Sequence, residues 1–402
     1  MSGMDGTPIA NRTRISLFGR RNAGKSSLVN ALAGQSVAIV SDVPGTTTDP
    51  VSKTMEILPL GPCVITDTAG LDDEGDLGAE RVARSLAVLD STDIAIWVQP
   101  ASEELSDDIS PVRARCGERN VPLLVVRTKS DLLAEVAKRD DSSGFYVSAR
   151  TGEGIEELRG RITAAVPQER PGPLVSDLVS RGDIVICVCP IDAAAPKGRL
   201  ILPQQQVVRE LIESGASALV CQPSELADLV EKVGREKIRF VITDSQAFAA
   251  VDAATPREVP LTSFSIVFAR QKGDLQTLVA GAAMLKRLKD GDTVLVSEGC
   301  THRRQCGDIG TVKIPAWIRK FTGKNLDFRF SSGGDFPVDG GGCTPRRPAL
   351  VVHCGGCMLS RRAVLSRIAR STDAGIPIVN YGVAIALMHG IVVRPGTCFV
   401  ER

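Results

Sequence analysis

The segment Gly19–Ser27 reads GRRNAGKSS, and it lies between an apolar run typical of a strand and a segment with helical periodicity. It matches G-x-x-x-x-G-K-S, in which glycines let backbone N–H groups curve around phosphate oxygens at the amino end of a helix. In this pattern Lys25 would reach the β- and γ-phosphates and Ser26 would bind Mg²⁺. The stretch therefore predicts a nucleotide site, and a glycine-rich turn with a chance lysine is the alternative. The residues expected to line the site are Gly19, Asn22, Gly24, Lys25, Ser26 and Ser27.

Two further segments offer groups for the metal ion and the γ-phosphate. The sequence DTAG, Asp67–Gly70, ends the strand that follows the P-loop helix. Asp67 is suited to hold Mg²⁺ through water, and the N–H of Gly70 can sense the γ-phosphate. Thr47, in the segment PGTTTDP, would close on both. We expect the catalytic groups to be Lys25, Thr47, Asp67 and Gly70, with Ser26 and Thr47 as metal ligands.

The segment TKSD, Thr128–Asp131, ends another strand and predicts which base is bound. The carboxylate of Asp131 can accept two hydrogen bonds, from N1–H and the exocyclic amine of guanine. Adenine has no such donor pair and would leave the charge unpaired. Lys129 would lay its stem over the base, and backbone N–H groups at Ser148 and Ala149 would meet guanine O6. With Thr128, these residues predict a site for GTP and GDP.

These five elements, in this order, resemble the translation-factor-related small GTPases, and more closely the branch with an asparagine in the P-loop. Two positions depart from the usual pattern. Thr128 replaces the asparagine of N-K-x-D, and Leu71 follows DTAG where many GTPases carry a glutamine that positions water, so we expect slow intrinsic hydrolysis. Asn22 matches the position that coordinates K⁺ in the resembling branch, which implies a K⁺-stimulated GTPase. A simple turn residue is the alternative for Asn22.

Apolar strand-like runs alternate with helical segments through almost all of the 402 residues. This alternation predicts an α/β fold with mainly parallel sheets and helices on both faces. Proline-containing segments at 166–173 and 254–260 divide the chain into a P-loop GTPase domain at 1–168, a second domain at 175–258 and a third at 260–402. The small second domain would have exposed sheet edges that invite pairing with a second copy. We therefore expect a dimerisation domain there, and a homodimer or a larger assembly.

The composition is that of an ordinary globular protein, and it disfavours several partners. The net charge is +1, so no overall field attracts nucleic acid or a membrane surface. No apolar run reaches the roughly 18 residues that span a bilayer, and the first residues contain no signal-peptide core. The 11 cysteines then indicate a reducing cytoplasm, where thiols serve metals or catalysis. We expect a cytoplasmic protein with no nucleic-acid partner and no membrane partner.

Two of the three histidines stand beside cysteines in the last third of the chain. Cys300-x-His302 is followed, about fifty residues later, by His353-Cys354-x-x-Cys357. The two glycines inside the second motif permit a tight turn from which both thiolates bind one metal centre. Thiolates that converge from two strand ends select zinc or an iron–sulfur cluster. From the residues alone both metals stay open, a redox dithiol is a third alternative, and either histidine can support a ligand rather than be one.

The C-x-H…H-C-x-x-C signature downstream of a GTPase domain resembles the [FeFe]-hydrogenase maturation GTPases, the HydF family. The segments CPIDAAAPKGRLILPQQQ, LTSFSIVFARQKGDL and PIVNYGVAIALMHG are similar to the start of that family's dimerisation domain and to the flanks of its cluster domain. The resemblance thus covers nearly the whole chain. It implies that 260–402 is an iron–sulfur cluster-binding domain in which Cys300, Cys354 and Cys357 bind a [4Fe–4S] cluster. His302 and His353 match family positions whose ligand role varies.

The same resemblance implies a function and a set of partners. The protein would be a GTP-hydrolysing scaffold or carrier that assembles the di-iron precursor of the hydrogenase active site or delivers it to apo-[FeFe]-hydrogenase. Radical-SAM maturases would supply the parts of this precursor. The implied cofactors are GTP/GDP, Mg²⁺, K⁺ and a [4Fe–4S] cluster. The alternative is a tRNA-modification or ribosome-assembly GTPase with a structural zinc domain, and the 4% aromatic content and balanced charge disfavour the RNA surface it would need.

Overall fold

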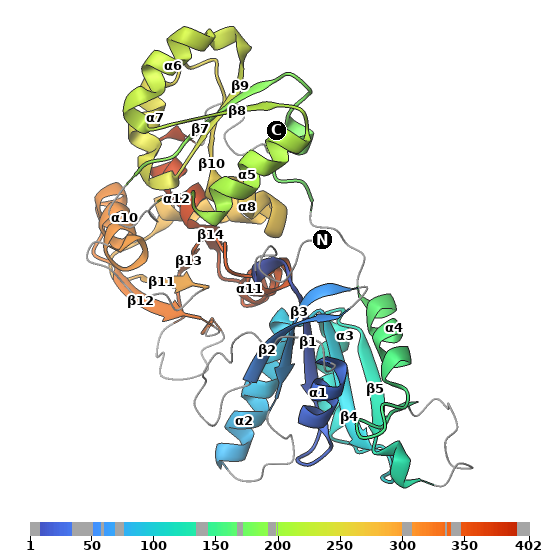
Figure 1. Cartoon of the computed structure of the whole chain (residues 1–402). Helices are drawn as coiled ribbons and strands as arrows, with labels where there is room; N and C mark the ends of the chain where they lie inside the picture. Colours follow the sequence, from blue (N-terminus) through green and yellow to red (C-terminus); the bar gives the residue numbers. More distant parts are fainter. Residues whose placement is uncertain are drawn as a thin grey trace. The chain divides into compact units, whose positions relative to one another are not determined.

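The computed structural model describes residues 9–33, 51–57, 60–68, 76–133, 144–166, 172–191, 198, 200–299, 308–333, 336–338 and 347–391. The chain folds into two compact units, Met1–Glu169 and Arg170–Arg402, and their described residues form three sheets (Figure 1). Among the helices in these ranges, none has both the length and the apolar character that crossing a bilayer requires.

The first unit contains a six-stranded sheet with the order β2-β3-β1-β4-β5-β6 over its described residues. All neighbouring strands are parallel except β2, which runs antiparallel to β3. The strands are β1 (Thr13–Phe18), β2 (Val51–Ile57), β3 (Gly61–Asp67), β4 (Ile94–Pro100), β5 (Leu123–Thr128) and β6 (Phe145–Tyr146). The helices are α1 (Lys25–Ala33), α2 (Asp76–Ala87), α3 (Ile109–Glu118) and α4 (Ile155–Ala165).

Helices cover both faces of this sheet. Successive side chains of a strand point to opposite faces, so a strand with apolar residues at successive positions has to be covered on both. Val98 of β4 packs in one core cluster with residues of α1 and α4, whereas its neighbour Trp97 packs in a second cluster with residues of α3. Every residue of β4 is buried. A strand covered on both faces explains why IAIWVQP is an almost continuous apolar run instead of an alternating one.

The second unit contains two four-stranded sheets, and every strand pairing described in them is parallel. The first, in the order β10-β9-β7-β8, is built from β7 (Ile184–Val188), β8 (Ser217–Cys221), β9 (Ile238–Thr243) and β10 (Leu261–Ser263). The second, in the order β12-β11-β13-β14, is built from β11 (Thr293–Glu298), β12 (Asp327–Ser332), β13 (Leu350–His353) and β14 (Ile378–Asn380). The prediction of an α/β protein with a P-loop GTPase sheet followed by two mainly parallel sheets is confirmed.

Eight α-helices are described in this unit. They are α5 (Leu202–Glu213), α6 (Leu226–Val233), α7 (Phe248–Ala254), α8 (Phe264–Lys272), α9 (Leu275–Ala282), α10 (Ile314–Thr322), α11 (Arg361–Asp373) and α12 (Tyr381–Met388). The serine Ser263 begins α8, where its side chain accepts a hydrogen bond from the N–H of Ile266. Asn380 begins α12 in the same way, by accepting from the N–H of Val383. Both are preferred helix-capping residues, so these two helices start where β10 and β14 end.

The two sheets of the second unit share one hydrophobic core. Val241 of β9 and Val294 of β11 belong to the same cluster of buried side chains. Helix α8 enters the core on two sides, since its Ile266 lies in this cluster and its Phe268 lies in another, with residues of β7 and α5. The boundary predicted near residue 259 falls between β9 and β10, which pair in one sheet. The domain bounds predicted from the sequence stay predictions.

A close backbone contact joins α9 to β14. A Cβ atom added at Gly281 would lie 2.0 Å from the carbonyl oxygen of Ile378, a distance that no side chain tolerates. The glycine therefore lets the helix lie directly on the strand. Strand β14 is paired with β13, the strand that leads into the second cysteine motif. The contact of α9 with β14 therefore also helps to hold β13 in place.

We expect Gly281→Ala to destabilise the protein by about 2 kcal/mol or more, because the added methyl group overpacks a backbone contact that cannot open freely. Gly160→Ala in α4 is the matched control, since a Cβ there meets nothing within 4 Å. That variant should gain about 0.5–1 kcal/mol of stability from higher helix propensity. Calorimetric unfolding of the full chain measures both changes, and a neutral Gly281→Ala would contradict the close contact.

Candidate nucleotide site and candidate metal centre

The P-loop connects β1 to α1, and its lysine folds back onto the loop. Lys25 is buried, and its Nζ donates hydrogen bonds to the carbonyl oxygens of Gly19, at 3.0 Å, and Arg20, at 2.8 Å. Gly19 has a φ of 146°, and a Cβ there would lie 2.1 Å from the carbonyl oxygen of Val98. Only glycine therefore lets the chain leave β1 so close to β4. The loop's own carbonyls hold the ammonium that was predicted to reach the phosphates.

Two of the residues predicted for Mg²⁺ lie together where α1 begins and β3 ends. Ser26 Oγ donates a hydrogen bond to Oδ2 of Asp67 over 2.6 Å. The second carboxylate oxygen of Asp67, Oδ1, is buried and accepts no hydrogen bond from the described residues. Ser27 is exposed in the first turn of the helix. A hydroxyl beside a carboxylate with an unused oxygen suits a hard cation such as Mg²⁺. Thr47 and Gly70 lie outside the residues that the structure describes.

Side chains predicted to face the base tie the end of β5 to the P-loop. Thr128 is buried, and its Oγ1 donates a hydrogen bond to the carbonyl oxygen of Ala23 at 2.6 Å. Lys129 Nζ donates to the carbonyl oxygen of Asn22 at 2.9 Å. Lys129 and Asn22 both have a φ of 59°, and Gly24 has a φ of 94°. Thr128 therefore links strand and loop although it departs from the usual asparagine.

Asp131 accepts hydrogen bonds on both of its carboxylate oxygens. Ser148 Oγ donates to Oδ1 at 2.6 Å, and Nε of Arg150 donates to Oδ2 at 2.8 Å. The hydrogen bond from Ser148, and after it the one from Arg150, lowers the pKa of Asp131. The carboxylate is therefore ionised at neutral pH. Ala149, the residue between Ser148 and Arg150 in the chain, is half-buried. Arg150 was not predicted, and its only signal in the sequence is its place directly after VSA.

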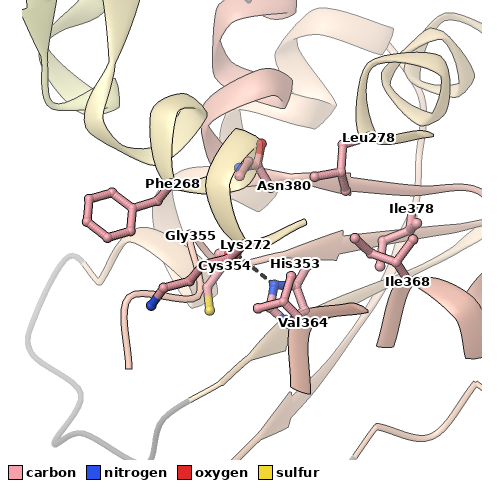
Figure 2. A pocket seen from close by; sticks show the side chains of 11 residues that line it. Phe268, Lys272, Leu278, His353, Cys354, Gly355, Val364, Ile368, Ile378 and Asn380 are labelled. Carbon is pink, nitrogen blue, oxygen red and sulfur yellow. Dashed lines mark hydrogen bonds between the residues drawn. The ribbon is translucent and has the colours of Figure 1, made fainter. Parts of the chain in front are cut away.

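The second cysteine motif forms a tight turn at the carboxyl end of β13 (Figure 2). The backbone N–H of Cys354 donates to the carbonyl oxygen of Ser297 in β11 at 2.9 Å. The N–H of Gly299 donates to Sγ of Cys354 at 3.1 Å. Gly356 has a φ of 66°, in the region that glycine enters most readily, before the chain reaches Cys357. Both thiols are free and half-buried, and their turn lies at the end of β11.

Burial governs the electrostatics of these two thiols. It raises the pKa of Cys354, where the N–H of Gly299 opposes it. Burial, and after it the neighbouring Cys354, raises the pKa of Cys357, where Lys272 opposes them. A soft metal ion must therefore displace two protons to bind here. Within the described residues no three histidine, cysteine or acidic side chains are arranged to hold a metal. Cys300 and His302 are not among those residues.

His353 is buried, and both of its ring nitrogens have partners. Nη1 of Arg367 lies 3.0 Å from Nε2, and Nδ1 lies 2.7 Å from the carbonyl oxygen of Cys354. Arginine can only donate, so Nε2 accepts and Nδ1–H donates. Burial, and after it Arg367, lowers the pKa of His353 to about 4, so the ring is neutral. This arrangement favours a role in orienting the cysteine turn, because a metal at Nε2 would have to replace Arg367.

A small, mainly apolar pocket lies behind the cysteine turn, with walls from α8, α9, α11 and β14 (Figure 2). Its walls include Phe268, Lys272, Leu278, Cys354, Ile378 and Asn380. Lys272 was not predicted as a site residue. Its local sequence, FSIVFARQK, ends in several polar residues and does not distinguish this lysine from an ordinary residue at a helix end.

Curated relatives match part of the chain. The chain is 35% identical over 166 residues to the tRNA modification GTPase MnmE of Nitrosomonas europaea. This matched region is 40% of this chain and 36% of the relative. It is also 38% identical over 152 residues to MnmE of Methylobacterium radiotolerans, and that matched region is 38% of this chain and 32% of the relative. The chain thus spans about a third of the length of these relatives. The chain is also similar to a solved structure of a variant of Aquifex aeolicus Era bound to GDP.AlF4-. The match covers 55% of this chain and 98% of the Era chain, with 19% identity and a TM-score of 0.33.

Three family models match successive parts of the chain. Residues 14–129 match a model described as 50S ribosome-binding GTPase. Residues 174–273 match the hydrogen maturase F dimerization domain, and residues 276–395 match the hydrogen maturase F tetramerization domain. The last two together span more than half of the 402 residues, as the resemblance noted in the sequence predicts. The chain belongs to the HydF family, with a GTPase domain ahead of that family's dimerisation and tetramerisation domains.

Proposed function

We propose that the first unit binds GTP with Mg²⁺ and hydrolyses it. The support is the edge of the sheet where β1, β3 and β5 end, because ligands of such sheets bind outside the carboxyl ends of the strands. Lys25 would leave its loop carbonyls for the β- and γ-phosphates, while Ser26 and Asp67 hold Mg²⁺. Thr47 would close on the metal, and the N–H of Gly70 would contact the γ-phosphate. The backbone of the P-loop would supply the remaining phosphate donors.

We propose that guanine is selected by the carboxylate of Asp131. The carboxylate is ionised, and it already accepts hydrogen bonds of the kind that N1–H and the exocyclic amine of guanine would donate. The base would replace Arg150 at Oδ2. Lys129 would cover one face of the base, and Ser148 and Ala149 would offer backbone N–H groups to O6.

We further propose that Cys300, Cys354 and Cys357 hold a [4Fe–4S] cluster. The observation that carries this proposal is the hydrogen bond from the N–H of Gly299 to Sγ of Cys354, since the next residue in the chain is Cys300. Soft thiolates suit zinc or iron–sulfur clusters, and membership of the HydF family favours the cluster. With three cysteine ligands, one iron of a bound cluster offers a position for another ligand. His302 and His353 are candidates for that ligand or for its support.

On this basis we propose that the protein is a scaffold or carrier for the di-iron precursor of the [FeFe]-hydrogenase active site. Radical-SAM maturases would supply its parts, and apo-[FeFe]-hydrogenase would receive it. The dimerisation and tetramerisation domains of the family support a homo-oligomer. We do not propose a function in tRNA modification, because the likeness to those GTPases covers 40% of the chain or less in the relatives described. Residues 174–273 and 276–395 match domains of hydrogen maturase F instead.

Asp131→Asn should weaken GTP binding by roughly a hundredfold or more, because an amide cannot accept from both guanine donors. The same variant should gain affinity for xanthosine triphosphate, whose base has an oxygen in place of the exocyclic amine. Fluorescence titration with labelled nucleotides measures both affinities. Asp107→Asn removes an exposed carboxylate of the same unit and should change neither. Unaltered GTP affinity in Asp131→Asn would contradict the proposed base site.

The proposed K⁺ site predicts faster GTP hydrolysis in KCl than in NaCl at equal ionic strength. Asn22→Gly should make the two rates equal, because it deletes the side-chain oxygen that would bind K⁺. Glycine also adopts the φ of 59° found at Asn22, so the loop conformation is kept. Steady-state phosphate release in the two salts measures the effect. Equal rates for the unmodified chain would remove the basis for a K⁺ site.

The cluster proposal predicts a brown protein after anaerobic reconstitution with iron and sulfide, with an EPR signal when it is reduced. Cys354→Ser should lose most of this iron, because one of three soft ligands is replaced by a weak one. Cys221→Ala removes a buried thiol of β8 and should retain the iron. A colourless wild-type protein with one zinc per chain would instead favour a structural zinc domain.

A further inference from the structure

Lys272, the last residue of α8, is almost fully buried, with 5% of its surface exposed. Its Nζ donates hydrogen bonds to three carbonyl oxygens in and just after the cysteine turn, which is Cys354–Cys357: those of Gly356 at 3.4 Å, Cys357 at 3.2 Å and Leu359 at 3.0 Å. Figure 2 shows the lysine side chain beside Cys354. An ammonium has three N–H donors, so these carbonyls engage all of them. One side chain therefore holds three points of the segment that carries two of the proposed ligands.

Burial disfavours the positive charge of Lys272, and groups around its Nζ partly compensate for this cost. A buried ammonium is costly unless it is well hydrogen-bonded, and here the three carbonyls meet that need. The ring of Phe268 lies 5.4 Å from Nζ, and the carboxyl end of α8 carries the negative end of the helix dipole. Burial lowers the pKa of Lys272 to about 8, and the nearby Cys357 and Cys354 oppose this.

Much of the packing that positions Lys272 lies outside the cysteine turn. Helix α8 has Ile266 in one core cluster and Phe268 in another. The helix belongs to the segment that matches the dimerisation domain, whereas the turn belongs to the segment that matches the tetramerisation domain. An apolar side chain would fill this buried place at lower cost, so the cation points to a role beyond packing.

We propose that Lys272 is a positioning residue of the metal centre, which holds the Cys354–Cys357 turn in its ligand-binding shape and offsets the negative charge of bound thiolates. The charge role rests on the proposed cluster, whereas the holding of the turn does not depend on which metal binds. Reduction adds one negative charge to a cluster, so a fixed cation nearby favours the reduced form.

The first test uses the metal-free full chain and measures amide hydrogen exchange by mass spectrometry over residues 354–360. Lys272→Met should speed exchange there by roughly tenfold or more, because the turn loses hydrogen bonds to a charged donor. Lys272→Arg keeps charge and donors and should have a smaller effect. Lys286→Met changes an exposed lysine of the same unit and should have none. Unchanged exchange in Lys272→Met, with its thermal unfolding intact, would overturn the holding role.

The second test uses chains reconstituted anaerobically with iron and sulfide and titrates the cluster potential by EPR. The midpoint potential of Lys272→Met should be more negative than that of the wild type, and that of Lys272→Arg close to it. Loss of iron from Lys272→Met with retention in Lys272→Arg would also support the proposal. An equal potential in wild type and Lys272→Met would overturn the charge role. A wild-type chain that takes up no iron contradicts the proposed cluster, and hydrogen exchange then still decides whether Lys272 holds the turn.

Discussion

The pairing of β11 with β13 is the constraint on which the candidate metal centre depends. Because the strands are parallel, their carboxyl ends meet at one edge of the sheet, where Ser297 pairs with His353. The pairing continues past the strands, through the hydrogen bonds from Cys354 N–H to Ser297 and from Gly299 N–H to the cysteine sulfur. A slip of one residue would send these side chains to the opposite face. The buried valines of both strands oppose such a slip, so ordinary core packing decides where the thiols lie.

Both candidate sites use cations to satisfy polar groups near strand ends. Arg367 of α11 donates to the ring of His353, and Lys272 of α8 donates to the carbonyls of the cysteine turn. In the first unit, Lys25 is held by P-loop carbonyls and Arg150 by the carboxylate of Asp131. A ligand at the candidate metal centre therefore meets a turn that is already hydrogen-bonded and oriented, whereas GTP would have to displace Lys25 and Arg150 from their partners. Such preorganisation of the turn reduces the ordering that binding requires.

The sequence was informative where chemistry lies within one short segment. The P-loop and the apolar run of β4 were predicted because glycine spacing and burial on both faces leave local patterns. Strand β2, at the edge of the described sheet, was not predicted, since VSKTMEI lacks the continuous apolar run of the central strands and contains four polar residues in seven. Lys272 was not predicted because its partners lie 84 to 87 residues away, and no local pattern reports that contact. His353 was predicted as a possible ligand from its place beside Cys354, but its two hydrogen bonds depend on tertiary structure.

The burial of α8 on two sides limits how the second unit can deform. A helix that belongs to two core clusters cannot tilt without opening voids in both, and tightly packed interiors resist such voids. The two sheets therefore act as one rigid frame instead of two lobes joined by a hinge. A displacement imposed on the first sheet, for example by a neighbouring copy, would pass through α8 to the cysteine turn.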